Sequence, residues 1–212
     1  MNFNLSEEHV MIQQAARDFA QTELLPEVIE RDTHQTFPAA QVKKMGEMGF
    51  LGMMVDPKYG GAGMDSISYV LAMEEIAKVD ASAAVVMSVN NSLVCAGLEK
   101  YCNEDQKMKY LVPLASGEVI GAFALSEPEA GSDATSQKTT AVDMGDHYLL
   151  NGTKNWITNG GTASYYIVIA QTDPEKKHKG INAFIVERGW EGFEIGPKED
   201  KLGIRGSDTH SL

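Results

Sequence analysis

The spacing of hydrophobic residues changes near residue 118, from a helical period to a strand period. Between residues 6 and 32, the inward positions of a 3.6-residue period carry apolar or small side chains, chiefly Ile12, Ala15, Ala16, Phe19 and Leu24. Ser6 is suited to cap this helix, and Pro26 is expected to kink or divide it. Similar patterns predict helices within residues 36–50, 66–80, 82–102 and 103–118, of which the largely apolar 82–102 is expected to be central.

Beyond residue 118, apolar and polar residues alternate over short stretches separated by glycine, asparagine, aspartate and proline. These stretches predict strands within residues 119–126, 139–152, 153–158, 164–172, 181–187 and 193–204. A hairpin is expected around Gly145 and Asp146. Because the helices precede the strands and do not alternate with them, the sequence predicts an α+β fold. We expect an all-α helical domain over residues 1–118 and an antiparallel β-barrel or β-sandwich domain over residues 119–212.

The composition is that of an ordinary globular protein, with 43% hydrophobic and 23% charged residues. A net charge of -12 disfavours binding to nucleic acid, although backbone amides and local lysines could still hold a phosphorylated ligand. Cys95 and Cys102 lie two helical turns apart, so we expect two single thiols rather than a disulfide. No apolar run approaches the ~18 residues of a membrane span, and no secretion signal is apparent, so a cytoplasmic location is expected.

The sequence gives little support for a phosphate-binding loop, a dinucleotide-binding site, a hydrolase site or a zinc site. The glycine-rich "YGGAG" at residues 59–63 follows no strand and lacks a Lys-Ser/Thr pair at phosphate-loop spacing, so a turn between helices is favoured. No GxGxxG stands between a strand and a helix, and no GxSxG is present. The five histidines, which are His9, His34, His147, His178 and His210, show no zinc-ligand spacing. Rossmann, hydrolase and metal sites are therefore disfavoured.

Two strand ends are less easily explained, namely "ALSEPEAGSD" at 124–133 and "GTKNWITNGG" at 152–161. The carboxylates of Glu127, Glu129 and Asp133 could form an acid–base site, but the neighbouring proline favours a solvated turn. In the second stretch, Trp156 and Thr158 are expected on the same face of a strand, where core packing is the simplest interpretation. The alternative is a pocket for a flat heteroaromatic ring, which needs a stacking wall and a few hydrogen bonds at its polar edge.

These stretches, together with "FNLSEEHVMIQQAARDFA", "DPKYGGAGMD", "EEIAKVDASAAV" and "KEDKLGIRGSDT", resemble the acyl-CoA dehydrogenases along the whole chain. "MSVNNSL" and "KKHKGINAF" are most similar to the short-chain, butyryl-type branch. The resemblance implies an FAD-dependent oxidoreductase that converts an acyl-CoA to a trans-2-enoyl-CoA. It also implies electron transfer to electron-transfer flavoprotein and a homotetrameric assembly.

The resemblance further implies which residues line the FAD. The set, called here the candidate flavin set, comprises Phe123, Ala124, Leu125, Ser126, Glu127, Pro128, Glu129, Ala130, Gly131, Ser132, Trp156, Ile157 and Thr158. Within it, Ser126 and nearby backbone amides would donate hydrogen bonds to the pyrimidine edge of the flavin ring. Trp156 would lie against the ring, Thr158 near its N5 region, and Ser132 would contact the CoA part of the substrate. Arg205 matches an arginine near the active site, without an assigned role.

The family's C-terminal four-helix domain, which carries the catalytic glutamate, has no counterpart in residues 1–212. The resemblance therefore assigns no catalytic base here, and we expect a fragment with little or no dehydrogenase activity, truncated at Leu212 within a strand. Two alternatives remain open at this point. One is a flavin oxidase or monooxygenase of the same fold, and the other is a non-catalytic acyl-CoA-binding module.

Overall fold

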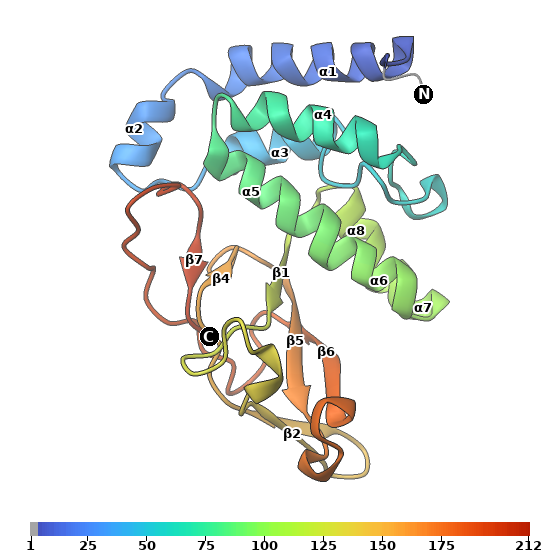
Figure 1. Ribbon diagram of the computed structural model, residues 1–212, viewed down its shortest axis with the longest axis vertical. Coiled ribbons are helices and arrows are strands. Elements are labelled where there is room, and N and C mark those ends of the chain that lie inside the picture. The colour runs from blue at the N-terminus through green and yellow to red at the C-terminus, as the bar shows by residue number, and fades with distance from the viewer. Residues whose placement is uncertain (1–3) are drawn as a thin grey trace. The chain divides into compact units, whose positions relative to one another are not determined.

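The computed structural model describes residues 4–212, which divide into two compact units. The helical unit holds the described residues up to Val119 and the later segment Asp200–Ser207. The sheet unit holds Ile120–Glu199 and Asp208–Leu212. Helices followed by a sheet confirm the predicted α+β class (Figure 1).

The helices of the helical unit begin and end close to where the sequence predicts. They are α1 (Glu7–Phe19), α2 (Val28–Thr33), α3 (Ala39–Glu47), α4 (Ser66–Ala77), α5 (Ala81–Ser88), α6 (Ala96–Tyr101), α7 (Glu104–Gln106) and α8 (Val112–Ala115). Wider, π-type turns continue α1, α5 and α7 through Ala20–Leu24, Val89–Cys95 and Lys107–Leu111, respectively. A short 3-10 turn, Pro57–Tyr59, lies between α3 and α4.

The helix boundaries follow from local chemistry. Ser6 caps α1 as predicted, because its side chain accepts the backbone N–H of His9 at 3.2 Å. Pro26 separates α1 from α2, and Glu27 beside it has a left-handed backbone with a φ of 63°. Asn103 caps α7 in a reciprocal pair with Gln106, also as predicted.

The helical span Ala81–Tyr101 is the central helix that the sequence predicts. By length and composition alone it could cross a membrane, contrary to the expectation that no segment comes close, but 61% of its apolar window is buried inside the structure. Its buried Asn90 donates to the carbonyl oxygens of Leu51 and Leu114, at 2.8 and 3.0 Å. Asn91 accepts the N–H of Met53 at 2.8 Å. These contacts are those of a core helix that holds the loop after α3.

A buried carboxylate joins α1 to α4, which lie side by side (Figure 1). The Glu75 side chain is 4% exposed and accepts two hydrogen bonds from Arg17, both at 3.0 Å. It also accepts from Gln13 and Lys78, each at 3.0 Å. The Arg17 hydrogen bond, opposed by burial and aided by Lys78, lowers the pKa of Glu75 to about 2.

This carboxylate makes a pH-dependent contribution to stability. Because the pKa is depressed below its ordinary 4.5, the stabilisation is complete above pH 4.5 and is lost as the pH falls towards 2. We expect Glu75→Gln to lower the free energy of unfolding by about 2 kcal/mol at pH 7, since it weakens charge-assisted hydrogen bonds. The difference in the free energy of unfolding between Glu75→Gln and wild type should disappear as the pH falls from roughly 5 to 2. Urea unfolding measured at a series of pH values tests this.

The matched control is Glu74→Gln on the same helix, where the Glu74 side chain is 55% exposed and pairs only with Lys78 among the described residues. It should leave stability almost unchanged at every pH. A Glu75→Gln deficit that persisted undiminished at pH 2 would contradict the assignment.

The strands of the sheet unit are β1 (Gly121–Ala124), β2 (Thr140–Asp143), β3 (Tyr148–Asn151), β4 (Ile157–Thr158), β5 (Tyr165–Gln171), β6 (Ile181–Glu187) and β7 (Thr209–His210). Short 3-10 turns cover Ala134–Ser136 and Pro174–Gly180. A five-stranded sheet runs in the order β1-β5-β2-β3, with β6 also paired to β5, and β4 pairs separately with β7. The predicted hairpin joins β2 to β3, and Gly145 in its turn has a φ of 99°.

Two details of the predicted sheet need correction. The sheet is mixed and not purely antiparallel, because β1 pairs in parallel with β5, from Gly121 opposite Tyr165 onwards. The long connection between these strands makes the parallel pairing possible. Within residues 193–204 no strand forms, and Lys198 makes only an isolated bridge to His210. Gly196 and Pro197 interrupt that stretch, and proline lacks the N–H that a strand ladder needs.

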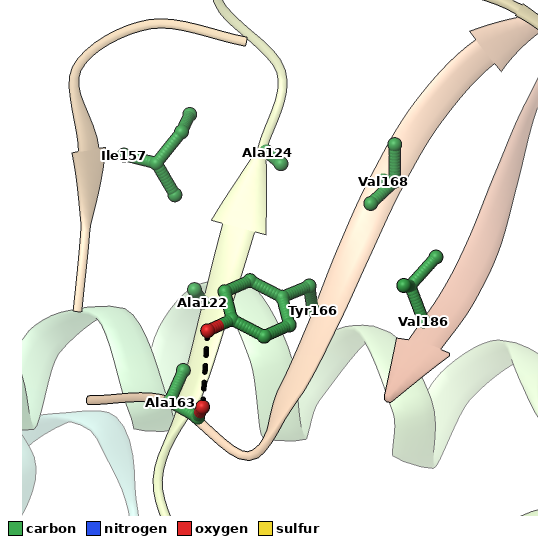
Figure 2. Packing of buried hydrophobic residues seen from close by; sticks show 7 residues of the cluster. All are labelled: Ala122, Ala124, Ile157, Ala163, Tyr166, Val168 and Val186. Carbon is green, nitrogen blue, oxygen red and sulfur yellow. Dashed lines mark hydrogen bonds between the residues drawn. The ribbon is translucent and has the colours of Figure 1, made fainter. Parts of the chain in front are cut away.

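The core of the sheet unit forms around Tyr166, which is 0% exposed (Figure 2). Its hydroxyl donates to the carbonyl oxygens of Gly160 and Ala163, at 2.8 and 3.1 Å, and burial raises its pKa to about 12. The cluster also contains Ala124 of β1 and Ile157 of β4. Both strands that carry the sequence motifs are therefore anchored in one core.

Candidate functional site

The chain leaves β1 through a tight turn at residues 127–130. The backbone N–H of Glu127 donates to the carbonyl of Ala130 at 3.0 Å, and the reverse bond is 3.2 Å. Pro128 occupies the second position of this turn, which its fixed φ favours. Glu127 and Ala130 are buried, whereas Pro128 and Glu129 form the exposed tip. Gly131 and Ser132 follow in exposed backbone.

Trp156 directly precedes β4 and has a left-handed backbone conformation, with a φ of 60°. The residue is 60% exposed. The prediction that Trp156 and Thr158 share one strand face is wrong, since β4 contains only Ile157 and Thr158. A left-handed backbone costs a residue with a side chain about 1–2 kcal/mol. Residues held in such sparsely populated backbone conformations cluster at functional sites. Core packing of Trp156 is excluded by its exposure.

The structure brings the two motif stretches together. The backbone N–H of Asn155 donates to the carbonyl oxygen of Ser126 at 2.8 Å. One residue earlier, the ammonium group of Lys154 donates to the carbonyl oxygen of Leu125 at 3.0 Å. The half-buried Ser126 and the exposed Trp156 therefore lie on directly bonded segments. Phe123 is half-buried at the end of β1, and Thr158 is half-buried in β4.

The carboxylates of the first motif have different environments. Asp133 and Glu129 are exposed, as expected for a solvated turn; Asp133 accepts from the hydroxyls of Thr135 and Ser136. These hydrogen bonds hold the pKa of Asp133 below its ordinary value. Glu127 differs, because its side chain is only 5% exposed and pairs at 2.7 Å with Lys154. A solvated turn is therefore the wrong interpretation for Glu127.

A separate cavity of about 380 Å³ opens in the sheet unit beside these segments. Its wall includes Leu150, Val168, Val186, Phe193 and Leu212, and it also reaches Lys154. No member of the candidate flavin set lines it. Of the second motif stretch, Gly152, Thr153 and Lys154 reach this cavity, whereas Trp156 and Thr158 lie outside it.

Comparison with known proteins identifies the family. Residues 6–118 match the family described as "Acyl-CoA dehydrogenase, N-terminal domain", and residues 122–212 match "Acyl-CoA dehydrogenase, middle domain". The chain belongs to the acyl-CoA dehydrogenase family. The resemblance seen in the sequence is confirmed.

Curated acyl-CoA dehydrogenases are similar along this whole chain. It is 48% identical over 212 residues to the short-chain specific acyl-CoA dehydrogenase of Clostridium acetobutylicum, covering 100% of this chain and 56% of that protein. It is 51% identical over 208 residues to the mitochondrial short-chain specific acyl-CoA dehydrogenase of Homo sapiens. That match covers 98% of this chain and 50% of the human protein. The chain therefore spans about half the length of the curated relatives it matches.

Several solved structures share the fold. Butyryl-CoA dehydrogenase from Megasphaera elsdenii is 44% identical with a TM-score of 0.95, over 100% of this chain and 56% of that one. A chain from the structure described as electron transferring flavoprotein of Acidaminococcus fermentans is 46% identical, with a TM-score of 0.97 over the same shares. A glutaryl-CoA dehydrogenase from Mycobacterium smegmatis in complex with FADH2 is 37% identical, with a TM-score of 0.92. The match covers 98% of this chain and 52% of that one.

The other candidates of this acyl-CoA dehydrogenase chain have structural explanations. In "YGGAG" the N–H groups of Gly60, Ala62 and Gly63 donate to carbonyls of the chain, which confirms a turn. Cys95 and Cys102 are free thiols as predicted, and burial raises the pKa of Cys95 to about 12. No cluster of three potential metal ligands occurs among residues 4–212.

Arg205 belongs to the segment that joins the helical unit of the acyl-CoA dehydrogenase chain. Its backbone N–H donates to Asp32 at 2.9 Å, and its guanidinium lies 3.8 Å from Asp200. Gln35 also donates to Asp200, at 2.9 Å. These contacts attach the segment to the end of α2.

Sequence reasoning missed Lys154 and Asn155, which make the bonds between the two motifs of this acyl-CoA dehydrogenase chain. Both precede Trp156 in the quoted "GTKNWITNGG". The available signal was charge, since Lys154 is the one charged residue of its stretch and the other stretch carries three carboxylates. Pairing them required knowing that the strand ends meet.

Proposed function

We propose that the whole protein is an FAD-dependent acyl-CoA dehydrogenase that oxidises a short-chain acyl-CoA to the trans-2-enoyl-CoA. The hydrogen bond from Asn155 to Ser126 carries the proposal, because it unites the two motif stretches beside an exposed, strained Trp156. The short-chain relatives at 48% and 51% identity support the substrate class.

The residues present fit a flavin ring. Trp156 offers an aromatic wall, and the half-buried Ser126 and Thr158 offer hydroxyl groups on segments whose neighbours Ala124 and Ile157 belong to one core. A flat heteroaromatic ligand needs this combination of stacking surface and few polar groups. When bound, FAD would supply the acceptor for the hydride that leaves the β carbon of the substrate.

Five members of the candidate flavin set then have individual roles within the proposal. Ser126 and its neighbouring amides donate hydrogen bonds to the pyrimidine edge, where negative charge accumulates on reduction. Trp156 stacks against the ring, and Thr158 approaches its N5 region. Gly131 has open space around its Cα, which lets a ligand come close, and the exposed Ser132 contacts the CoA moiety.

We assign the base that removes the α-proton to none of the described residues. The buried carboxylates of Glu75 and Glu127 are held by ion pairs, and the pKa of each lies at about 2. Groups with such a low pKa are poor proton acceptors near neutral pH. Electron-transfer flavoprotein as electron acceptor, a homotetramer and a cytoplasmic location complete the proposal, on family resemblance.

The proposal is tested on the protein expressed from its complete reading frame. We expect a yellow preparation whose flavin absorbance bleaches on anaerobic titration with a C4 acyl-CoA, and much less with C8 or C16. Bleaching by C16 alone would contradict the substrate class. A preparation that binds FAD but bleaches with none of the three would favour an oxidase, and a colourless one would favour a non-catalytic module.

A further inference from the structure

Lys154 and Glu127 form a buried ion pair between the two motif stretches. Their side chains are 4% and 5% exposed. The ammonium group of Lys154 has three hydrogens and donates to three acceptors, namely Glu127 Oε1 at 2.7 Å, the Leu125 carbonyl at 3.0 Å and Gln137 Oε1 at 3.2 Å. The Glu127 carboxylate also accepts the backbone N–H groups of Lys138 and Thr139, at 2.5 and 3.0 Å.

Stability alone does not account for this pair. Removing two charges from water is costly, and well-packed apolar residues of similar size stabilise a fold equally well or better. The loop has other anchors as well, including the backbone bonds between Glu127 and Ala130. A pair placed at this junction therefore points to a role beyond holding the loop.

The geometry indicates what that role is. The Leu125 carbonyl that accepts from Lys154 belongs to the same peptide group as the N–H of Ser126. A positive charge on a carbonyl oxygen polarises the peptide and makes its N–H a stronger donor, most of all where the local dielectric is low. The next peptide is fixed by the bond from Asn155 to the Ser126 carbonyl. The peptide groups on both sides of Ser126 thus each accept a hydrogen bond from the Lys154–Asn155 segment.

We propose that Lys154 and Glu127 are positioning residues of the flavin site, which orient and polarise the Leu125–Ser126 peptide and so set the affinity and reduction potential of the bound flavin. The inference rests on the proposed function, since it concerns the FAD assigned there. Neither residue needs to touch the flavin, because each acts through the peptide groups around Ser126.

The two partners respond to burial differently. Burial lowers the pKa of Lys154, opposed by its hydrogen bond to Glu127 and the charge of Glu127. Burial alone would raise the pKa of Glu127, but the N–H of Lys138, the Lys154 ammonium and Thr139 outweigh it and lower the pKa to about 2. The negative charge of Glu127 therefore stays fixed near neutral pH.

The test uses Lys154→Met and Glu127→Gln in the protein expressed from its complete reading frame. Lys154→Met leaves one buried negative charge, so the midpoint potential of the flavin should become more negative and the FAD dissociation constant should rise roughly tenfold. Glu127→Gln keeps an acceptor for the backbone N–H groups but leaves one buried positive charge, so the potential should become less negative. Opposite shifts are the signature, because structural loosening would move both variants in one direction.

Lys138→Met is the matched control, since its side chain lies in the same region but is 73% exposed. It should leave both FAD affinity and potential unchanged. If Lys154→Met and Glu127→Gln lower the melting temperature but keep the wild-type potential, or shift it in the same direction, the inference is overturned while the proposed function stands. A wild-type protein that binds no FAD overturns the proposed function itself.

Hydrogen exchange keeps the inference testable if either variant fails to fold. In the wild-type apoprotein, the N–H of Asn155 should be protected, because the peptides around Ser126 are held before any ligand binds. Exchange at the rate of an exposed loop would overturn the inference.

Discussion

Replacement of Trp156 by alanine is expected to raise the dissociation constant for FAD at least tenfold while hardly changing the stability of the apoprotein. Stacking of an aromatic side chain on a flat ring contributes about 1–3 kcal/mol, and tenfold corresponds to about 1.4 kcal/mol. Trp156 is 60% exposed, so its removal exposes little additional core. The measurement is flavin fluorescence titration of the apoprotein, beside thermal unfolding without flavin.

The variant Trp156→Gly separates the loss of the aromatic ring from the strain of the left-handed backbone. It removes the same ring, so its loss of FAD affinity should equal that of Trp156→Ala. Glycine adopts the φ of 60° without a side-chain clash, so the apoprotein should be about 1 kcal/mol more stable than the alanine variant. Trp156→Phe keeps a stacking surface and should retain most of the affinity. Unchanged FAD affinity in the alanine variant would remove Trp156 from the candidate flavin set.

The largest expected effect on stability is at Asp80, which joins two structural roles. One carboxylate oxygen of Asp80 accepts the N–H of Ala83 at 3.0 Å and caps α5, and the other pairs at 3.0 Å with Arg31. The side chains of Arg31 and Asp80 are 9% and 6% exposed. Asp80→Ala leaves a buried guanidinium without its counter-charge, so we expect a loss of about 4 kcal/mol in the free energy of unfolding. Denaturant unfolding followed by helical circular dichroism measures it.

Asp80→Asn separates the two roles. Asparagine caps a helix as well as aspartate but carries no charge, so it should recover only the cap, about 1 kcal/mol of the loss. The control is Glu104→Gln, which removes an ion pair with Lys58 whose side chains are 60% and 61% exposed, and which should change little. An Asp80→Ala variant as stable as Glu104→Gln would show that the buried pair contributes nothing.

Local chemistry made the helical unit predictable. Ser6, Pro26 and Asn103 set helix boundaries through groups within a few residues of themselves, so their effects could be read in order along the chain. The apolar helix after Asp80 was expected to be central, and its buried asparagines agree with that position. The two motif stretches and their small polar residues were equally visible in the sequence and led to the family.

Contacts distant in sequence were decided only by the tertiary structure. The parallel pairing of β1 with β5 depends on how the intervening chain crosses over, and no local pattern encodes it. The left-handed Trp156 replaced a predicted regular strand, because the bond from Asn155 to Ser126 and the burial of Ile157 fix both sides of it. The sequence around Glu127 favours a solvated turn, but in the folded chain Lys154 pairs with Glu127 and both side chains are buried. The types of residue in a stretch indicate a possible site. Which residues are buried and which charges pair depends on which segments meet, and only the folded chain determines those meetings.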